Sequence, residues 1–213
     1  MRARLLAVIA AAGAVAAVIP AHAATGAAKP TPQVTDPTGD ANGLNSQEGL
    51  LPANPNQATA PASYTNGDIV SVTFATVFKK VHRKKVPTGF TATLTLAAPP
   101  TDTHVDYNID ADVSGCDGFV DFDYNIDPTV GANSISCFHA TDPTDPTSLT
   151  AGATAYAAPP AVVSGNSITW TVPLSTFKVG TQFTGLDAQT LVSPTFAPEI
   201  DEASSTNTFT VGK

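Results

Sequence analysis

Apolar and polar residues alternate strictly along two stretches of this chain, residues 105–113 and 120–126. An apolar residue or a tyrosine occupies every second position of each stretch, and Asp or Asn fills the positions between them. Successive side chains of a β-strand point to opposite faces of its sheet, so this period of two predicts strands with one buried face and one acidic face. The two stretches therefore favour a fold in which the buried faces of sheets pack together.

The same period recurs along residues 70–78 and 90–96, where Thr, Ser and Ala separate the larger apolar residues. The chain is rich in Thr, Ala, Pro, Asp and Asn and poor in Lys and Glu, which favours strands and turns over helices. About nine short strands, joined by turns rich in Pro, Gly and Asp, predict an all-β fold, an antiparallel β-sandwich. A short helical turn is expected at 174–177, and the further strands are expected around 134–139, 153–157, 167–172, 182–191 and 207–211.

The first residues carry the pattern of an export signal. Arg2 and Arg4 precede a small and apolar run over residues 5–19, which ends at an A-x-A sequence over residues 21–23. This pattern predicts a signal peptide over residues 1–23, and hence a secreted, extracellular protein. The run is shorter than the roughly 20 apolar residues of a membrane helix, and no comparable run follows, so no transmembrane segment is expected in the mature chain.

The remainder of the 213-residue chain suits a single domain with a sizeable core. Residues 24–34 are small, contain Pro and lack apolar periodicity, which is typical of a flexible tail. We therefore expect a flexible tail over 24–34 and a single β-sandwich domain over 35–213. Residues 35–67 contain no strand pattern, and a loop of this length is uncommon in a compact domain unless it is functional or held by a ligand.

Charge excludes one class of partner and points to another. The formal charge of the chain is −8, and removal of Arg2 and Arg4 would make it more negative, so nucleic acid is not an expected partner. Half of the ten Lys and Arg residues nevertheless lie in one short segment, residues 79–85. This basic segment is interpreted either as a solvated hairpin tip or as a contact for an anionic polymer of the cell envelope. Its five basic residues are Lys79, Lys80, Arg83, Lys84 and Lys85.

Cys116 and Cys137 are the only cysteines, and in an exported protein such a pair is expected to form one disulfide. The crosslink would stabilise the fold by about 3 kcal/mol in the chain-entropy interpretation. A metal-thiolate site and a redox pair are the alternatives. Both are disfavoured, because no C-x-x-C spacing occurs and His139 is the only histidine near a cysteine in the sequence.

The two acidic stretches also permit a prediction of register. If Ser114 and Gly115 form a two-residue hairpin loop, Ile109 faces Val120 and the apolar residues of both stretches match. The other face then brings carboxylates together, which is unfavourable unless water, cations or a basic neighbour compensates. A cation or sugar platform is conceivable there, whereas a glycosidase pair is not expected because no cleft is indicated. The predicted polar pairs are Asp112 with Asp117, Asn108 with Asp121, and Asp106 with Asp123.

A Gly-punctuated turn at residues 35–43 is a candidate calcium site. Calcium takes six to eight oxygen ligands from carboxylates, amide side chains and backbone carbonyls. The spacing of Asp36, Asp40 and Asn42 supplies such oxygens, and Asp68 lies at the start of the next strand. The alternative is an ordinary turn, because Asp and Asn also favour turns by bonding to their own backbone.

The segments TDPTGDANG at 35–43 and GDIVSVTFAT at 67–76 resemble the opening of DOMON and family-nine carbohydrate-binding modules, including the C-terminal module of glucodextranase-like proteins. NSITWTVPLSTF at 166–177 resembles the penultimate strands of that group, and the mature chain is also similar to uncharacterised secreted proteins of actinobacteria. The resemblance implies a secreted ligand-binding sandwich, in some relatives with bound sugar or haem. It also implies structural calcium near the first turn, at Asp36, Asp40 and Asp68.

This chain departs from those modules in two respects. Trp170, its only tryptophan, shares a face with Ile168 and Val172 and is expected in the core, where it cannot stack on a sugar. Met1 is the only methionine, so ligation of haem by Met and His is not available.

No catalytic motif is present. The histidines beyond residue 23 are His82, His104 and His139, and neither a G-x-S-x-G nor an H-E-x-x-H sequence occurs. We therefore expect a non-catalytic binding or interaction module at the cell envelope or in the medium. Its expected partner is an envelope polymer, a glycan or another secreted protein. A carbohydrate-binding module is the alternative function, and a secreted hydrolase assembled from distant loops is a remoter one.

Overall fold

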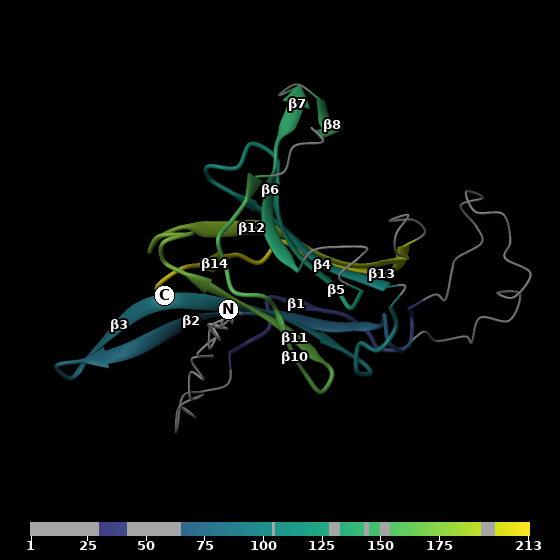
Figure 1. Cartoon of the computed structure of the whole chain (residues 1–213), viewed down its shortest axis with the longest axis horizontal. Helices are drawn as coiled ribbons and strands as arrows, with labels where there is room; N and C mark the ends of the chain where they lie inside the picture. The colour runs from purple at the N-terminus through teal and green to yellow at the C-terminus, as the bar shows by residue number, and fades with distance from the viewer. Residues whose placement is uncertain are drawn as a thin grey trace, which may run out of the picture.

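The strands form two antiparallel sheets that pack face to face, so the predicted all-β sandwich is confirmed (Figure 1). The computed structural model describes residues 30–41, 65–103, 105–127, 133–142, 145–149, 154–192 and 199–213. The predicted signal peptide lies outside these residues. Within the described ranges there is no helix, and hence none long and apolar enough to cross a membrane.

The five-stranded sheet has the order β1-β2-β3-β11-β10, and the seven-stranded sheet has the order β13-β12-β4-β5-β6-β9, with β14 also paired to β12. Strands β7 and β8 form a separate two-stranded ribbon beyond β6 (Figure 1). The strands are β1 (Val34–Thr35), β2 (Ile69–Val81), β3 (Lys84–Leu96), β4 (Val105–Val113), β5 (Phe119–Asn125), β6 (Ser134–Phe138), β7 (Ala140–Asp142), β8 (Asp145–Leu149), β9 (Thr154–Ala155), β10 (Val162–Ser164), β11 (Ser167–Pro173), β12 (Gln182–Val192), β13 (Glu199–Ser205) and β14 (Phe209–Thr210).

Aromatic side chains from both sheets fill the space between them. Phe74 on β2 meets Phe122 on β5 edge to face, with ring centroids 5.8 Å apart, and Phe90 on β3 lies 5.2 Å from Phe183 on β12. All four rings are at most 2% exposed, and full burial of one such side chain stabilises a fold by roughly 1.5–3 kcal/mol. The alternation in the sequence therefore has its predicted result, a shared core between two sheets.

Trp170 belongs to this core, as its alternation with Thr169 and Thr171 predicts. Its side chain is 1% exposed, and its ring lies 6.2 Å from that of Phe122. The indole N–H donates to the backbone oxygen of Asp123 on the facing sheet, at 3.2 Å. This hydrogen bond satisfies the one polar atom of the indole. Burial of the ring leaves no tryptophan surface for a ligand.

The predicted register between β4 and β5 is wrong by two residues. The turn at Ser114 and Gly115 does form, because the Cys116 N–H donates to the oxygen of Val113 at 3.2 Å. Pairing resumes later than predicted, since Cys116 leaves the ladder to join Cys137 and β5 begins only at Phe119. A shift by two keeps each side chain on its face but changes its partners. The observed polar pairs are Asp110 with Asp121, Asn108 with Asp123, and Asp106 with Asn125.

The sandwich begins slightly before the predicted boundary. Val34, which the sequence assigns to the flexible tail, is 1% exposed and pairs with Val72 on β2. Gln33 also binds β2, because its side chain accepts from the Phe74 N–H at 2.6 Å and its N–H donates to Val72. The start of the sandwich is therefore tied to β2 through backbone and side-chain hydrogen bonds.

The expected helical turn at 174–177 is a hydrogen-bonded turn rather than a helix, with the Thr176 N–H donating to Pro173 at 3.0 Å. Several strands were not predicted at all, namely β1, β7, β8, β10 and β13. They are short or lack a clean apolar alternation, so their place is decided by the neighbouring strand to which they pair.

Candidate metal centre

Four carboxylates meet where the loop after β1 lies near the start of β2 and near β13. We call this group the clamp site: Asp36, Asp40, Asp68 and Asp201. Three of the four, Asp36, Asp40 and Asp201, each place one carboxylate oxygen so that all lie within 4.8 Å of one another. The fourth, Asp68, acts electrostatically on Asp36. The clamp site draws on the first loop, on the residue preceding β2, and on β13 of the opposite sheet.

The first loop is shaped by a hydrogen bond to Asp68. Asp36 follows β1, and its N–H donates to the oxygen of Val70 at 3.1 Å. The chain then turns at Gly39, whose φ of 92° favours glycine, and the Gly39 N–H donates to Asp68 Oδ2 at 2.7 Å. Asp40 follows this turn at an exposed position. A short turn therefore brings Asp36 and Asp40 to the same point.

Asp68 is buried with one oxygen unsatisfied. Its side chain is 1% exposed, Oδ2 accepts from Gly39, and Oδ1 is buried without a hydrogen-bond partner. Asp36 Oδ2 is likewise buried without a hydrogen-bond partner. Buried polar atoms in proteins are nearly always paired, and buried carboxylates are paired or bind metals. Two unpaired carboxylate oxygens at one place are what a cation would satisfy.

Asp201 joins the clamp site from the other sheet, and sequence reasoning missed it. It pairs with Thr190 on β12, so its side chain points to the interior, and it is 9% exposed. Asp201 Oδ2 accepts from the Ile69 N–H at 2.7 Å, and the Thr190 hydroxyl donates to the oxygen of Gly67, also at 2.7 Å. These bonds tie β12 and β13 to the start of β2. The sequence offered only a weak signal for Asp201, namely an acidic residue in a segment that has no apolar alternation.

Every charged neighbour that shifts the clamp carboxyls is another carboxyl. Burial, followed by repulsion from Asp40 and Asp68, raises the pKa of Asp36 to about 6. Burial raises the pKa of Asp201 to about 7; the hydrogen bond from the Ile69 N–H opposes this shift, and repulsion from Asp36 and Asp40 adds to it. Burial also raises the pKa of Asp68. The site is thus electrostatically strained at neutral pH, and a bound cation would relieve the strain.

Three of the four sequence-predicted ligands, Asp36, Asp40 and Asp68, therefore come together. The fourth, Asn42, lies outside the described residues. Carboxylate oxygens with no nitrogen or sulfur donors suit a hard cation such as calcium. The donor set fits the ion that the sequence pattern predicts.

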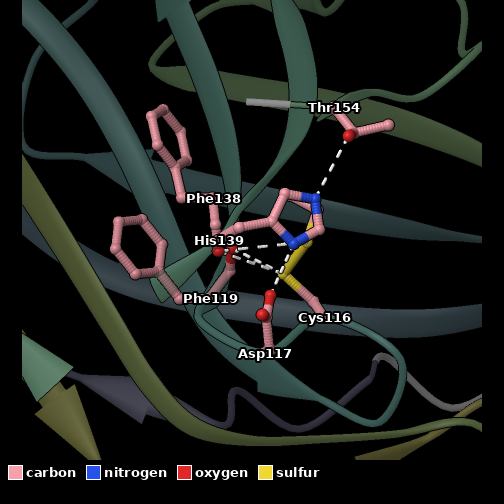
Figure 2. The surroundings of a disulfide bond; sticks show 7 residues. Cys116, Asp117, Phe119, Phe138, His139 and Thr154 are labelled. Carbon is pink, nitrogen blue, oxygen red and sulfur yellow. Dashed lines mark hydrogen bonds and ion pairs between the residues drawn. A yellow bond between two sulfur atoms is a disulfide. The ribbon is translucent and has the colours of Figure 1, made fainter. Parts of the chain in front are cut away.

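The predicted disulfide between Cys116 and Cys137 is present, with an S–S distance of 2.02 Å. Figure 2 shows His139 beside it, between Asp117 and Thr154. His139 Nδ1 lies 2.5 Å from Asp117 Oδ1, and Nε2 lies 3.1 Å from the Thr154 hydroxyl. The hydrogen bond with His139 lowers the pKa of Asp117. Since both sulfurs are in the crosslink, this cluster does not offer the thiolate that a metal site would require.

The basic segment forms the tip of the β2–β3 hairpin. Its turn is made by His82 and Arg83, both with positive φ, and all five basic side chains are exposed. Pairing of β3 with β11 ends at Gly89, and pairing of β2 with β1 ends at Val72, so residues 78–87 pair only with each other. We call residues 78–87 the basic arm, which extends past the rest of its sheet (Figure 1).

The histidines that the sequence offered for catalysis do not form one described group. His82 lies at the tip of the basic arm and His139 lies beside the disulfide of the other sheet. His104 lies outside the described residues.

The chain matches no protein family, no curated protein and no solved structure. Its function is therefore inferred from its own chemistry.

Proposed function

We propose that the mature chain is an exported, non-catalytic binding module of the cell envelope or the surrounding medium, which contacts an anionic polymer through the basic arm. The observation that carries this proposal is the concentration of five exposed cations on residues 78–87 of a chain whose formal charge is −8. Export is supported by the signal-peptide pattern of residues 1–23.

The exposure of the arm fits a contact surface. Phe78 is 41% exposed and Val86 is 37% exposed, and they stand among the basic side chains. Lys80 pairs with Lys85, so two like charges face each other across the hairpin. Such a pair is unfavourable in isolation, and an anionic polymer would neutralise it. The acidic body would meanwhile keep other parts of the molecule away from that polymer.

The clamp site has a supporting role in this proposal. Calcium bound by Asp36, Asp40, Asp68 and Asp201 would link the first loop and β2 to β13, and so hold the two sheets together at one end. A cation that binds only the native state stabilises it in proportion to the logarithm of its concentration. An exported domain is exposed to calcium, and extracellular calcium-binding modules have dissociation constants of about 10⁻⁴ to 10⁻³ M.

The arm is tested by binding the mature protein to an array of wall teichoic acid, acidic polysaccharide and neutral glycans. Replacement of all five basic residues by Gln should lower affinity for the anionic polymers at least tenfold, and added salt should weaken wild-type binding. The control is a Lys178→Gln, Lys213→Gln variant, because those two lysines lie outside the arm. Unchanged binding by the five-residue variant would reject the arm as the contact.

Carbohydrate binding is a second candidate, favoured by a hollow near the disulfide. Phe119 and Phe138 are partly exposed neighbours on β5 and β6, with ring centroids 5.2 Å apart (Figure 2). A cavity of about 490 Å³ reaches Cys116 and Gly118, the residue before Phe119, and its polar lining includes Asp112, Gln182 and Thr184. Aromatic rings beside hydrogen-bonding groups suit a sugar. Array binding to neutral glycans that Phe119→Ala abolishes, and that the arm variant retains, would favour this function.

A further inference from the structure

A row of carboxylates crosses the outer face of the seven-stranded sheet. Asp187 on β12 pairs with Asp110 on β4, and Asp110 pairs with Asp121 on β5. Directly paired residues of adjacent strands point to the same face of a sheet. We call these three residues the acidic row. Asn108 and Asp123, which pair with each other, lie beside it on the same face.

The acidic row is buried and short of hydrogen-bond donors. Asp121 is only 8% exposed, and Asp110 and Asp187 are half-buried. One oxygen in each, Oδ1, is buried without a hydrogen-bond partner, and so is Oδ1 of the neighbouring Asn108. Asp121, the most buried of the three, directly faces Asp110, whose Oδ1 also has no hydrogen-bond partner. Buried polar oxygens without partners are rare and require an explanation.

Among the residues that the structure describes, no basic residue compensates the acidic row. Burial raises the pKa of Asp110 to about 7, with repulsion from Asp187 and Asp123, and burial and its acidic neighbours raise the pKa of Asp121 well above its ordinary value. All charged groups that act on these two residues are carboxyls. The basic arm, which the sequence offered as a neighbour, belongs to the other sheet. The row therefore needs protons or cations from solution.

The spacing of the row suits a hard divalent cation. Adjacent strands lie roughly 4.8 Å apart, and calcium binds oxygen at about 2.3–2.6 Å. Carboxylates of directly paired residues such as Asp110 and Asp121 are therefore close enough in principle to share one ion. Asn108 Oδ1 offers a neutral oxygen beside them, and water would complete the six to eight ligands that calcium takes. Both unpartnered oxygens of the Asp110 and Asp121 pair would then be satisfied by one ion.

We propose that the acidic row is a second calcium-binding site, separate from the clamp site, with the ion held between Asp110 and Asp121 and bordered by Asp187 and Asn108. This proposal does not rest on polymer binding by the basic arm. It also does not rest on the clamp site, because the two groups share no residue and occupy different faces of the seven-stranded sheet, with Asp201 pointing inward and the row outward.

Calcium titration by calorimetry tests the proposal. The wild type should bind at least two ions, Asp121→Asn should lose one and keep the other, and Asp40→Asn should do the reverse. Asp112→Asn is the matched control, since Asp112 lies two residues from Asp110 on the same face but is exposed. An unchanged stoichiometry in Asp121→Asn would overturn the acidic row, whereas an unchanged stoichiometry in Asp40→Asn would overturn the clamp site.

Terbium offers a second readout in intact protein. The only tryptophan, Trp170, donates to the backbone of Asp123, two residues from Asp121 on β5, so excitation of its indole should sensitise terbium bound at the row. The signal should fall at least fivefold in Asp121→Asn and persist in Asp40→Asn, and calcium should displace it. Sensitised emission that is the same in wild type and Asp121→Asn would mean that protons alone neutralise the row, and would reject the proposal.

Discussion

The clamp site and the acidic row are both groups of buried carboxylates, but they are built differently. The clamp site converges from three separate segments, and backbone N–H groups of Gly39 and Ile69 already bind some of its oxygens. The acidic row is a line along one sheet, and among the described residues no three of its carboxylates come within the 4.8 Å that groups the clamp oxygens. We infer that a convergent site favours one tightly held ion, whereas a line favours weaker binding between pairs.

Removal of calcium should have the largest effect on this comparison. At about pH 8, an ion present at 100 times its dissociation constant stabilises the native state by about 2.7 kcal/mol, so chelation should lower stability by about 3–5 kcal/mol. The melting temperature should fall on the order of 10 °C, as measured by circular dichroism. Asp40→Asn should remove more of this shift than Asp121→Asn does. Asp112→Asn, the exposed control of the calorimetric test, should keep it all. Equal losses in the two site variants would contradict the contrast between them.

Loss of the disulfide should be the next largest effect. Replacement of Cys116 and Cys137 by Ser should lower the free energy of unfolding by about 3 kcal/mol, measured by urea denaturation. The crosslink joins Cys116, which follows the turn after β4, to Cys137 on β6. Strand β6 pairs with β5 next to Asp121. Calcium affinity of the acidic row should therefore fall in this variant, while that of the clamp site stays the same. A uniform change at both sites would show that the disulfide acts only on global stability.

The smallest effect is expected from Asp121→Asn in EDTA, and it should be a gain. A carboxyl whose pKa is raised by folding binds its proton more tightly in the native state, so native stability falls as pH rises. The window runs from the ordinary Asp value of 3.8 to about 7, the pKa of Asp110 and Asp123. Relief of one facing charge should stabilise the protein by about 1 kcal/mol at pH 8 and flatten its decline between pH 5 and 8. Urea denaturation across this range measures both, and a loss of stability at pH 8 would contradict the repulsion on which the row depends.

The comparison also shows which features could be predicted. Alternation along β4 and β5 correctly predicted that Asp106, Asp110 and Asp121 lie on the outer face. It predicted the wrong partners, because the ladder resumes only after Cys116 has left it for the disulfide. A period of two specifies the face of a strand, and any shift by an even number preserves that face. Pairs across strands therefore require knowledge of where the ladder restarts.

The clamp site was partly predictable for a similar reason. Asp36 and Asp40 lie close in sequence, so a turn rich in Gly and Asp already places them together. Asp201 is far from both in sequence, and its segment has no apolar alternation that would have identified β13. It reaches the site because β13 pairs with β12, and β12 is linked to the start of β2 through Thr190 and Gly67.

The amino-acid sequence by itself determined the all-β class, the buried and acidic faces of the main strands, the single disulfide and the position of the basic hairpin tip. These follow from local chemistry, since side-chain alternation, turn residues and a lone pair of cysteines act over short stretches or without competitors. Only the tertiary structure decided that Asp201 joins the clamp site, that Asp110 faces Asp121, and that the basic arm belongs to the other sheet. Each of these depends on which strands become neighbours, and that choice is made by packing of the whole core rather than by any one segment.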